Sequence, residues 1–399
     1  MKWSRRSTRF WIEAPYPVIR LLADSRVRLD TRGGAAGFDV VGRGELGARP
    51  MRILHAMSTA VDGAMERAFE QTVVTLSRHD VAQRVIVQSN SASAGRLKSA
   101  GLEPMELPFR KRFDFTSKRR LNNEISSFGA EIVVSWTPDV SSQVLQPQAK
   151  HIGYVTNDFP FSKFQTCDHL FTVTQQRFDR ALAAGWSKSK ITKLPPVIRS
   201  DGFTPLDRKT FFTPDTAKLV VFVGGLRDEK GLDVLLEATA RISGHYLWVV
   251  GDGPDKKKYE DHALEIGIKP RTRFVGAHSE ILPLMAAADL VVCPARQDDL
   301  GEQVMQAWAC SKPVIASDSL GPGLLINHRD NGVLVPVDDS RSLAEAIKWL
   351  NQDTDFSQRI ATAGAATFLK SHHEDIAIPE YLKFFESVLV GNDETAPVQ

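Results

Sequence analysis

The sequence predicts an α/β protein with two Rossmann-like domains that face each other across a cleft. Three observations support this prediction. From Met51 onward, apolar runs of strand length alternate with longer amphipathic runs. A proline-rich segment without periodicity, residues 201–216, divides this pattern into two sets and is the predicted linker. Strands that alternate with helices pair in parallel, because parallel strands need a crossover connection, which is usually a helix.

The composition limits the classes of protein to which the chain can belong. With 399 residues, of which 42% are hydrophobic and 25% charged, the chain can form two or three domains with large cores. A formal net charge of +2 gives no electrostatic argument for a nucleic-acid partner. No apolar run approaches the ~20 residues of a membrane span. Cys167, Cys293 and Cys310 are far apart and in no metal-binding spacing, so we expect reduced thiols in a cytoplasmic protein.

The first fifty residues differ from the rest. They contain ten Arg or Lys residues against five Asp or Glu residues, many glycines and no sustained period. We expect residues 1–50 to be a disordered extension, and Met51 to be the true start of the protein or of its first domain. The alternative is a basic arm that touches an anionic membrane surface through RFWIEAPYPVIRLLA, although two prolines make that stretch a poor helix.

The expected domains follow from the alternating pattern. The first covers residues 51–200, with strands predicted at MRILHAM, QRVIVQS, EIVVSW, HIGYVT and HLFTVT and a helix at AMERAFEQTVVTLSRH. The second covers residues 217–365, with strands predicted at KLVVFVGG, YLWVVG, TRFVG, LVVCPA, PVIAS and GVLVPV. Residues 366–399 are expected to form a final amphipathic helix and a tail that can pack back on the first domain.

A ligand of two facing Rossmann-like domains binds at the carboxyl ends of the strands. The first such segment is 223–238, where a strand ends at Gly224 and Gly225 and a helix begins near Gly231. Backbone amides at a helix start, with Arg227 and Lys230 beside them, suit a diphosphate. A tight turn with solvated charges is the alternative interpretation.

Two further strand ends carry glycines. In WVVGDGPDKKKYE, Gly251 and Gly253 let the backbone turn tightly and approach a ligand, whereas Lys256–Lys258 is expected to be a solvated helix face. The full dinucleotide fingerprint is missing, which argues against a nicotinamide enzyme. In RFVGAHSEI, Gly276 is expected to present backbone groups to a nucleobase, and His278 either makes a polar contact or faces solvent.

The fourth segment, residues 293–323, has an acidic, glycine-bearing loop that leads into a helix predicted at 302–310. Carboxylates accept hydrogen bonds from hydroxyl groups well, so such a loop can hold the hydroxyls of a sugar or a ribose. A helix start that faces the cleft also favours a sugar phosphate.

Taken together, these segments resemble the retaining GT-B glycosyltransferases of family 4. The resemblance rests on the order of VGGLRDEKG, VVGDGP, RFVG, DLVVCPA, DDLG, QAWACSKPVIASD and NGVLVPVDD. More narrowly, AWACSKPVIASDSLGPG and CDHLFTVT resemble bacterial glycosyltransferases of lipopolysaccharide core and envelope polysaccharide synthesis. The resemblance covers residues 51–390, densely in the second domain and loosely in the first.

The resemblance implies roles for particular residues. Lys230 would bind the donor diphosphate, Asp298 would contact the donor sugar, and Gln306 would contact the nucleotide ribose. On the first domain, Gly63, with Glu66 and Arg67 behind it, matches part of a glycine-rich loop that faces the phosphates. The implied catalytic residues are Asp298 and Lys230. The implied donor-binding residues are Gly224, Gly225, Arg227, Lys230, Gly251, Gly253, Gly276, Asp298, Gly301 and Gln306.

The sequence departs from the family pattern at several of these positions. Gly225 stands where the family has a phosphate-binding arginine, for which Arg227 is the candidate substitute. Both glutamates of the family's E-x7-E motif are changed, to Asp298 and Gln306, and Leu324 replaces a further glutamate. The histidine of the first-domain active site has no match, and its neighbourhood holds Thr156 together with the acceptor-side candidates Asn157 and Asp158.

The resemblance implies transfer of a sugar from a nucleotide diphosphate sugar to a glycan or glycolipid acceptor with retention, in the cytoplasm. Neither a metal nor another cofactor is expected. A basic stretch, Arg110–Arg112 and Lys118–Arg120, could bring the first domain to the inner face of the plasma membrane, although a solvated face explains it equally. Two alternatives remain: a catalytically impaired binding or assembly protein, motivated by the departures above, and a sugar-nucleotide epimerase.

Overall fold

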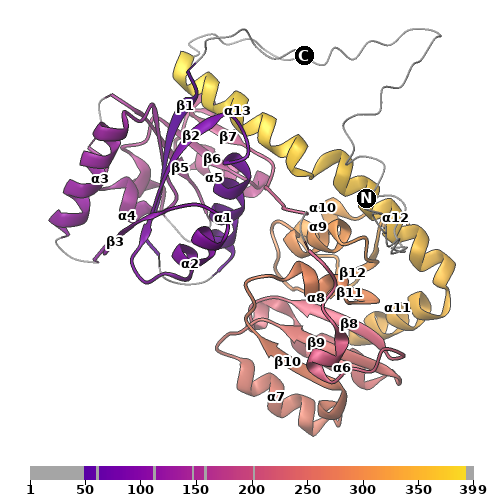
Figure 1. Cartoon of the computed structure of the whole chain (residues 1–399). Coiled ribbons are helices and arrows are strands. Elements are labelled where there is room, and N and C mark those ends of the chain that lie inside the picture. The colour runs from indigo at the N-terminus through magenta and orange to yellow at the C-terminus, as the bar shows by residue number, and fades with distance from the viewer. Residues whose placement is uncertain are drawn as a thin grey trace, which may run out of the picture. The chain divides into compact units, whose positions relative to one another are not determined.

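In the computed structural model, the chain forms two parallel β-sheets with helices on their faces (Figure 1). The structure describes residues 49–59, 63–110, 114–145, 148–156, 160–200 and 203–391. The expected N-terminal extension therefore lies outside the described residues, apart from its last two. By their internal contacts, Pro50–Gln399 form one unit.

The first sheet has seven strands in the order β3-β2-β1-β4-β5-β6-β7, each paired with its neighbours in parallel. The edge strands β3 and β7 have three residues each, which is too short for periodicity to predict them. The strands are β1 Met51–Met57, β2 Val81–Gln88, β3 Met105–Leu107, β4 Ile132–Ser135, β5 Lys150–Tyr154, β6 His169–Thr172 and β7 Ile191–Lys193.

Helices cover both faces of this sheet because successive strand residues point to opposite faces. Ile53 belongs to the apolar core beneath α1 and α2, whereas its neighbour Leu54 belongs to the core beneath α3 and α4. The helices are α1 Ala64–Leu76, α2 Ala92–Ser99, α3 Phe115–Phe128, α4 Pro138–Ser141 and α5 Gln175–Ala183, with the 3-10 turns η2 Phe161–Phe164 and η3 Lys188–Lys190.

The second sheet has six parallel strands in the order β10-β9-β8-β11-β12-β13. Leu219 and Val221 face the core beneath α8 and α9, and Val220 and Phe222 face the core beneath α6, α7 and α11. The strands are β8 Lys218–Val223, β9 His245–Val250, β10 Thr272–Gly276, β11 Leu290–Cys293, β12 Val314–Ser317 and β13 Val333–Val335.

The helices of this half follow the strands in regular alternation, as a doubly wound sheet requires. They are α6 Leu232–Ala240, α7 Lys256–Glu265, α8 Leu282–Ala286, α9 Glu302–Ala309, α10 Leu320–Leu325, α11 Ser340–Gln352 and α12 Thr354–Ser371, with η4 Arg208–Phe211, η5 Asp228–Lys230 and η6 Lys269–Arg271. The predicted boundary after residue 365 falls inside α12. The chain leaves this half only at His372 and His373.

The last helix, α13 (Glu374–Val390), returns to the first sheet (Figure 1). Its buried side chains, among them Phe384 and Phe385, share one apolar core with Phe69 of α1 and Trp136 after β4. The ring centroids of Tyr381 and Phe171 lie 5.9 Å apart, in an edge-to-face arrangement. The C-terminal segment is therefore structurally part of the first half.

Strand order locates the ligand-binding edge of each sheet. In the second sheet the order reverses between β8 and β11, which are adjacent although far apart in sequence. Loops that leave two such strands in opposite directions open a crevice between them, where ligands of doubly wound sheets bind. The loops in question are residues 224–231 and 294–301, which contain six of the ten predicted donor-binding residues. In the described ranges, no helix combines the length and apolarity that crossing a bilayer requires.

Candidate functional site

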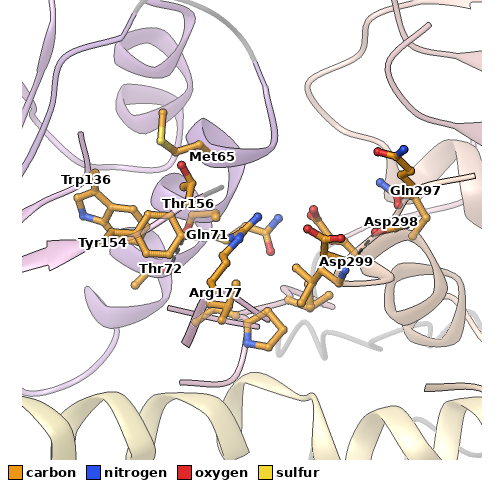
Figure 2. Close-up of a pocket in the computed structure, with 18 of the residues that line it drawn as sticks. Met65, Gln71, Thr72, Trp136, Tyr154, Thr156, Arg177, Gln297, Asp298 and Asp299 are labelled. Atoms are coloured by element: carbon orange, nitrogen blue, oxygen red, sulfur yellow. Dashed lines mark hydrogen bonds between the residues drawn. The ribbon is translucent and has the colours of Figure 1, made fainter. Parts of the chain in front are cut away.

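The carboxyl ends of the two sheets border a cavity of about 340 Å³ (Figure 2). One wall comes from the second sheet: η5, the loop after β11 and the first turn of α9. The other wall comes from α1, the ends of β4 and β5, and α5, with Tyr381 of α13. The lining residues used below are Gln71, Trp136, Tyr154, Arg177, Glu229, Lys230, Gln297, Asp298, Asp299 and Glu302.

The loop after β8 is shaped by close backbone contacts. Gly231 has a φ of 63°, which favours glycine, and a Cβ there would collide with the carbonyl oxygen of Pro294 at the end of β11. The glycine thus lets η5 pack directly on the next strand end. This packing brings Lys230 to the cavity wall beside Asp298.

Gly251 and Gly253, which follow β9, also lie in close contact with the loop after β8. A Cβ at Gly251 would collide with the carbonyl oxygen of Gly224, and one at Gly253 with that of Leu226, whose side chain is fully buried. Neither glycine is among the residues that line the cavity. Their close approach is therefore to the neighbouring loop, and a direct contact with the ligand stays a prediction.

The remaining predicted glycines differ in their surroundings. Gly225 is exposed, with open space where a Cβ would stand, and Gly276 has a φ of 81° and also faces open space. Gly301 has a φ of 68° and is the N-cap of α9, so it turns the acidic loop into the helix. Arg227 is exposed and lines neither this cavity nor the one described below, so its predicted place at the diphosphate is unsupported by the geometry.

Asp298 both organises its loop and faces the cavity. Its Oδ1 accepts hydrogen bonds from the backbone N–H groups of Leu300 (3.2 Å) and Gly301 (3.0 Å). The backbone carbonyl of Asp298 accepts a further bond from the N–H of Gly321. The carboxylate of Asp298 is thus held in position by its own loop.

Glu302, on the first turn of α9, is a charged wall residue that motif comparison did not select. Burial raises the pKa of its carboxyl, an effect opposed by Arg67 of α1, increased by Asp298 and opposed again by Lys230. The four charges therefore lie close enough to influence one another. Arg67 is accordingly an arginine near the site.

Gln306 lies one turn further along α9 and is buried, with 2% of its surface exposed. Its Nε2 donates a 2.7 Å hydrogen bond to Oε1 of Glu302, and its own Oε1 has no partner among the described residues. Gln306 lines a second cavity, of about 450 Å³, which also includes the loop after β10. Gln71 and Ile198 border both cavities, so the two adjoin.

The first-sheet wall of the site was largely missed by sequence reasoning. The rings of Trp136 and Tyr154 pack at a centroid distance of 4.8 Å, and Nη1 of Arg177 donates to the Tyr154 hydroxyl at 3.5 Å (Figure 2). The Trp136 indole N–H donates to Nδ1 of His55, whose pKa burial lowers to about 3, so this imidazole is neutral. The available signal was position relative to the predicted strands: Trp136 ends EIVVSW, Tyr154 lies near the end of HIGYVT, and Arg177 comes three residues after HLFTVT.

The acceptor-side predictions had mixed outcomes. Gly63 is the N-cap of α1, with an extended backbone, and Glu66 on the first turn of that helix is buried. Neither lines the two cavities. Asn157 and Asp158 lie outside the described residues.

Of the other residues considered, His278 and Leu324 are exposed, and Cys167, Cys293 and Cys310 are free and buried. In the described ranges, no cluster of three metal-ligating side chains occurs.

Solved structures with the same architecture include sugar transferases. A crystal structure of HepE from Anabaena with UDP and glucose superposes with a TM-score of 0.73 at 17% identity, over 84% of this chain and 100% of that one. WaaG, a glycosyltransferase involved in lipopolysaccharide biosynthesis, gives a TM-score of 0.61 at 17% identity, over 85% and 100%. These likenesses establish the GT-B fold, as predicted.

Sequence comparison gives the family. The model of the group 1 glycosyl transferases matches residues 204–367. The lipopolysaccharide core biosynthesis glycosyltransferases LpsD and LpsE of Rhizobium meliloti (strain 1021) are 27% and 26% identical, over 84% and 82% of this chain and 98% and 96% of theirs. The protein is thus a nucleotide-sugar glycosyltransferase with the GT-B fold. Its residues 204–367 belong to the group 1 glycosyltransferases of family 4, a retaining family, and the chain as a whole is related to LpsD and LpsE.

Proposed function

We propose that the protein transfers a sugar from a nucleotide diphosphate sugar to a glycan or glycolipid of the bacterial cell envelope, with retention of anomeric configuration. One observation carries the proposal: Lys230 and Asp298, from the two strand ends at the reversal of the second sheet, meet in a single cavity that the first sheet closes. LpsD and LpsE are lipopolysaccharide core biosynthesis glycosyltransferases, and HepE binds UDP and glucose, which agrees with the proposal.

The charges on the cavity wall suit the chemistry of sugar transfer. Loss of the nucleotide diphosphate leaves negative charge on its terminal oxygen, which Lys230 can stabilise electrostatically. Arg67 adds a second cation from the other half of the chain. The carboxylate of Asp298 suits the sugar hydroxyls, since it accepts hydrogen bonds and cannot donate them when ionised. The acceptor would approach along the wall formed by Trp136, Tyr154 and Arg177.

We further propose that the two halves of the chain bind different substrates. We assign donor binding to the half that begins at β8 and acceptor binding to the half that contains β1–β7 and α13. The adjoining cavities agree with this, because the second cavity has room for a nucleoside beside the diphosphate-binding residues. In this assignment Gln306 lies on the nucleoside side and Asp298 on the sugar side.

A membrane-associated acceptor is favoured by the surface of α3. Phe115 and Leu145 are 74% and 62% exposed, and Leu145 is held to α3 by a 2.8 Å bond from its N–H to Asn122 Oδ1. Arg119 and Arg120 are exposed on the same helix. Apolar side chains with adjacent cations suit an anionic lipid surface. We therefore place the protein at the inner face of the plasma membrane.

The donor proposal is tested by thermal unfolding with UDP-, GDP- and ADP-sugars and with the free nucleotides. A ligand that binds only the folded state raises the melting temperature by mass action. We expect one nucleotide series to do so. If no series shifts the transition at millimolar ligand, the donor assignment is wrong and the protein is a binding or assembly partner instead.

The membrane proposal is tested by sedimentation with vesicles of phosphatidylethanolamine and phosphatidylglycerol. The wild type should co-sediment in low salt and be released as the salt concentration rises. Arg119→Glu/Arg120→Glu should not bind, whereas Lys257→Glu, on the exposed face of α7, should behave as the wild type. Equal binding of both variants would exclude α3 as the contact.

A further inference from the structure

Two polar side chains on α9 form a pair that joins the two cavities. Glu302 and Gln306 are four residues apart, so they lie on the same face of the helix. Glu302 lines the cavity that contains Lys230 and Asp298, and Gln306 lines the adjoining one. The only hydrogen bond made by the Gln306 side chain among the described residues is the 2.7 Å bond from Nε2 to Oε1 of Glu302.

This bond fixes the orientation of the Gln306 amide. A primary amide has a donor end and an acceptor end, and rotation by 180° exchanges them. Oε1 of Glu302 accepts the bond from Nε2, so the NH₂ end of the amide faces Glu302. The carbonyl end then faces away from Glu302. That Oε1 is buried and lacks a donor among the described residues, which is costly unless a ligand supplies one.

Glu302 is itself held in place by its surroundings. Burial raises the pKa of its carboxyl, and Arg67 from α1 and Lys230 from η5 oppose this effect electrostatically. Its Oε1 already accepts the 2.7 Å bond from Nε2 of Gln306, so this oxygen is the acceptor that holds the amide. A neutral residue at 302 would leave the Gln306 amide free to adopt both orientations.

We propose that Glu302 is a positioning residue that holds the Gln306 amide with its oxygen toward the second cavity, so that position 306 acts purely as a hydrogen-bond acceptor for a ligand hydroxyl group. The inference rests on the proposed function, in which the ligand of this cavity is the nucleoside part of the donor and the hydroxyls are those of its ribose. A glutamine oriented in this way reproduces the acceptor character of the glutamate it replaces. Glu302 therefore compensates, from the same helix, for the presence of glutamine instead of glutamate at position 306.

The test compares nucleotides with and without ribose hydroxyls. Binding of UDP, GDP and ADP, and of their 2′,3′-dideoxy forms, is measured by titration calorimetry on the full chain. For the base that binds, we expect the wild type to prefer the ribose form by at least about tenfold. Glu302→Gln keeps a side chain of the same size but allows either amide orientation, and should reduce that preference to about threefold or less.

A double variant separates positioning from a merely structural effect. In Glu302→Gln/Gln306→Glu, the amide at 302 can donate to the carboxylate at 306, which is an acceptor in every orientation. We expect the preference for ribose to return. A structural role of Glu302 would instead weaken binding of both nucleotide forms equally and would not be rescued. Circular dichroism and urea unfolding of each variant check that it is folded.

The outcomes distinguish the inference from the function on which it rests. If the wild type binds no nucleoside diphosphate, the proposed function and the inference both fail. If the wild type binds but Glu302→Gln keeps the full ribose preference, only the inference fails. Absence of rescue in a folded double variant would contradict it as well.

Discussion

Lys230 is the residue whose removal should affect donor binding most. Among the residues that the structure describes, its Nζ makes no hydrogen bond or ion pair, whereas the exposed Lys257 is paired with Asp261. A charge-assisted hydrogen bond to a diphosphate contributes about 1.5–3 kcal/mol, so Lys230→Ala should weaken nucleotide binding roughly 10- to 100-fold. Titration calorimetry measures this directly. Lys257→Ala is the control, and an equal loss there would show that the effect is one of overall charge.

Glu302 should lower the stability of the ligand-free protein at neutral pH. Folding raises the pKa of its carboxyl, so the folded state holds that proton more tightly than the unfolded state does. Ionisation therefore opposes folding at a pH above the unfolded-state value of about 4.3, and this effect is absent below it.

Glu302→Gln should accordingly raise the free energy of unfolding at pH 7, and the gain should disappear as the pH falls toward about 4. Urea unfolding of both proteins at several pH values tests this. A gain that persists unchanged at low pH would show that the ionisation of Glu302 is not its cause. The same variant is expected to lose ribose selectivity, so stability and function oppose each other at this position.

At the scale of elements, the site depends on how closely the strand-end loops pack. Gly231→Ala would put a side chain against the backbone of Pro294 and would also force a residue with φ of 63° out of its favoured region. The left-handed backbone alone costs about 1–2 kcal/mol. We expect lower stability by at least that amount and weaker nucleotide binding, because η5 carries Lys230.

Gly225→Ala is the matched control, since it lies in the same loop with open space around its Cβ position. It should leave the free energy of unfolding within about 0.5 kcal/mol of the wild type. Both are measured by urea unfolding. If the two alanine variants behaved alike, the packing of η5 on β11 would not determine the geometry of the loop.

Helices and strands could be predicted from the sequence where their hydrophobic pattern extends over enough residues. The central strands of both sheets are buried and apolar, so β1, β8 and β9 were predicted nearly to the residue. The three-residue edge strands were not. In the second half, motif spacing also located Lys230 and Asp298, because their loops leave adjacent strand ends.

The rest of the site could not be predicted, because it depends on contacts between distant segments. Trp136, Tyr154 and Arg177 belong to three different strand ends, and Tyr381 reaches them from the last helix. Contact of Gly251 and Gly253 with the ligand stays a prediction, but their missing side chains also make room for the loop after β8, which the sequence did not indicate. Only the fold shows which neighbour a glycine approaches.

At the scale of the whole molecule, α13 ties the end of the chain to the first sheet. Phe385 is 1% exposed within the core that also contains Phe69 and Trp136. Phe385→Ala should lower the free energy of unfolding by about 3–5 kcal/mol, through loss of buried surface and a cavity. Phe115→Ala, at a 74% exposed position, should change it by less than about 0.5 kcal/mol.

Urea unfolding followed by tryptophan fluorescence measures the difference, because Trp136 lies in this core. The two-state analysis holds only if the halves unfold together, which coincident fluorescence and circular-dichroism transitions would show. If Phe385→Ala were as stable as Phe115→Ala, the helix would not contribute to the core of the first half.

The central claim is that one cavity, with Lys230 and Asp298 on its wall, binds a nucleotide sugar and transfers its sugar. The most direct measurement is proton NMR of the reaction with the best-binding donor and an acceptor prepared from lipopolysaccharide core. We expect turnover with the donor's anomeric configuration retained, and at least tenfold slower turnover by Lys230→Ala and Asp298→Asn in folded protein. Turnover with inversion, or variants as active as the wild type, would contradict it.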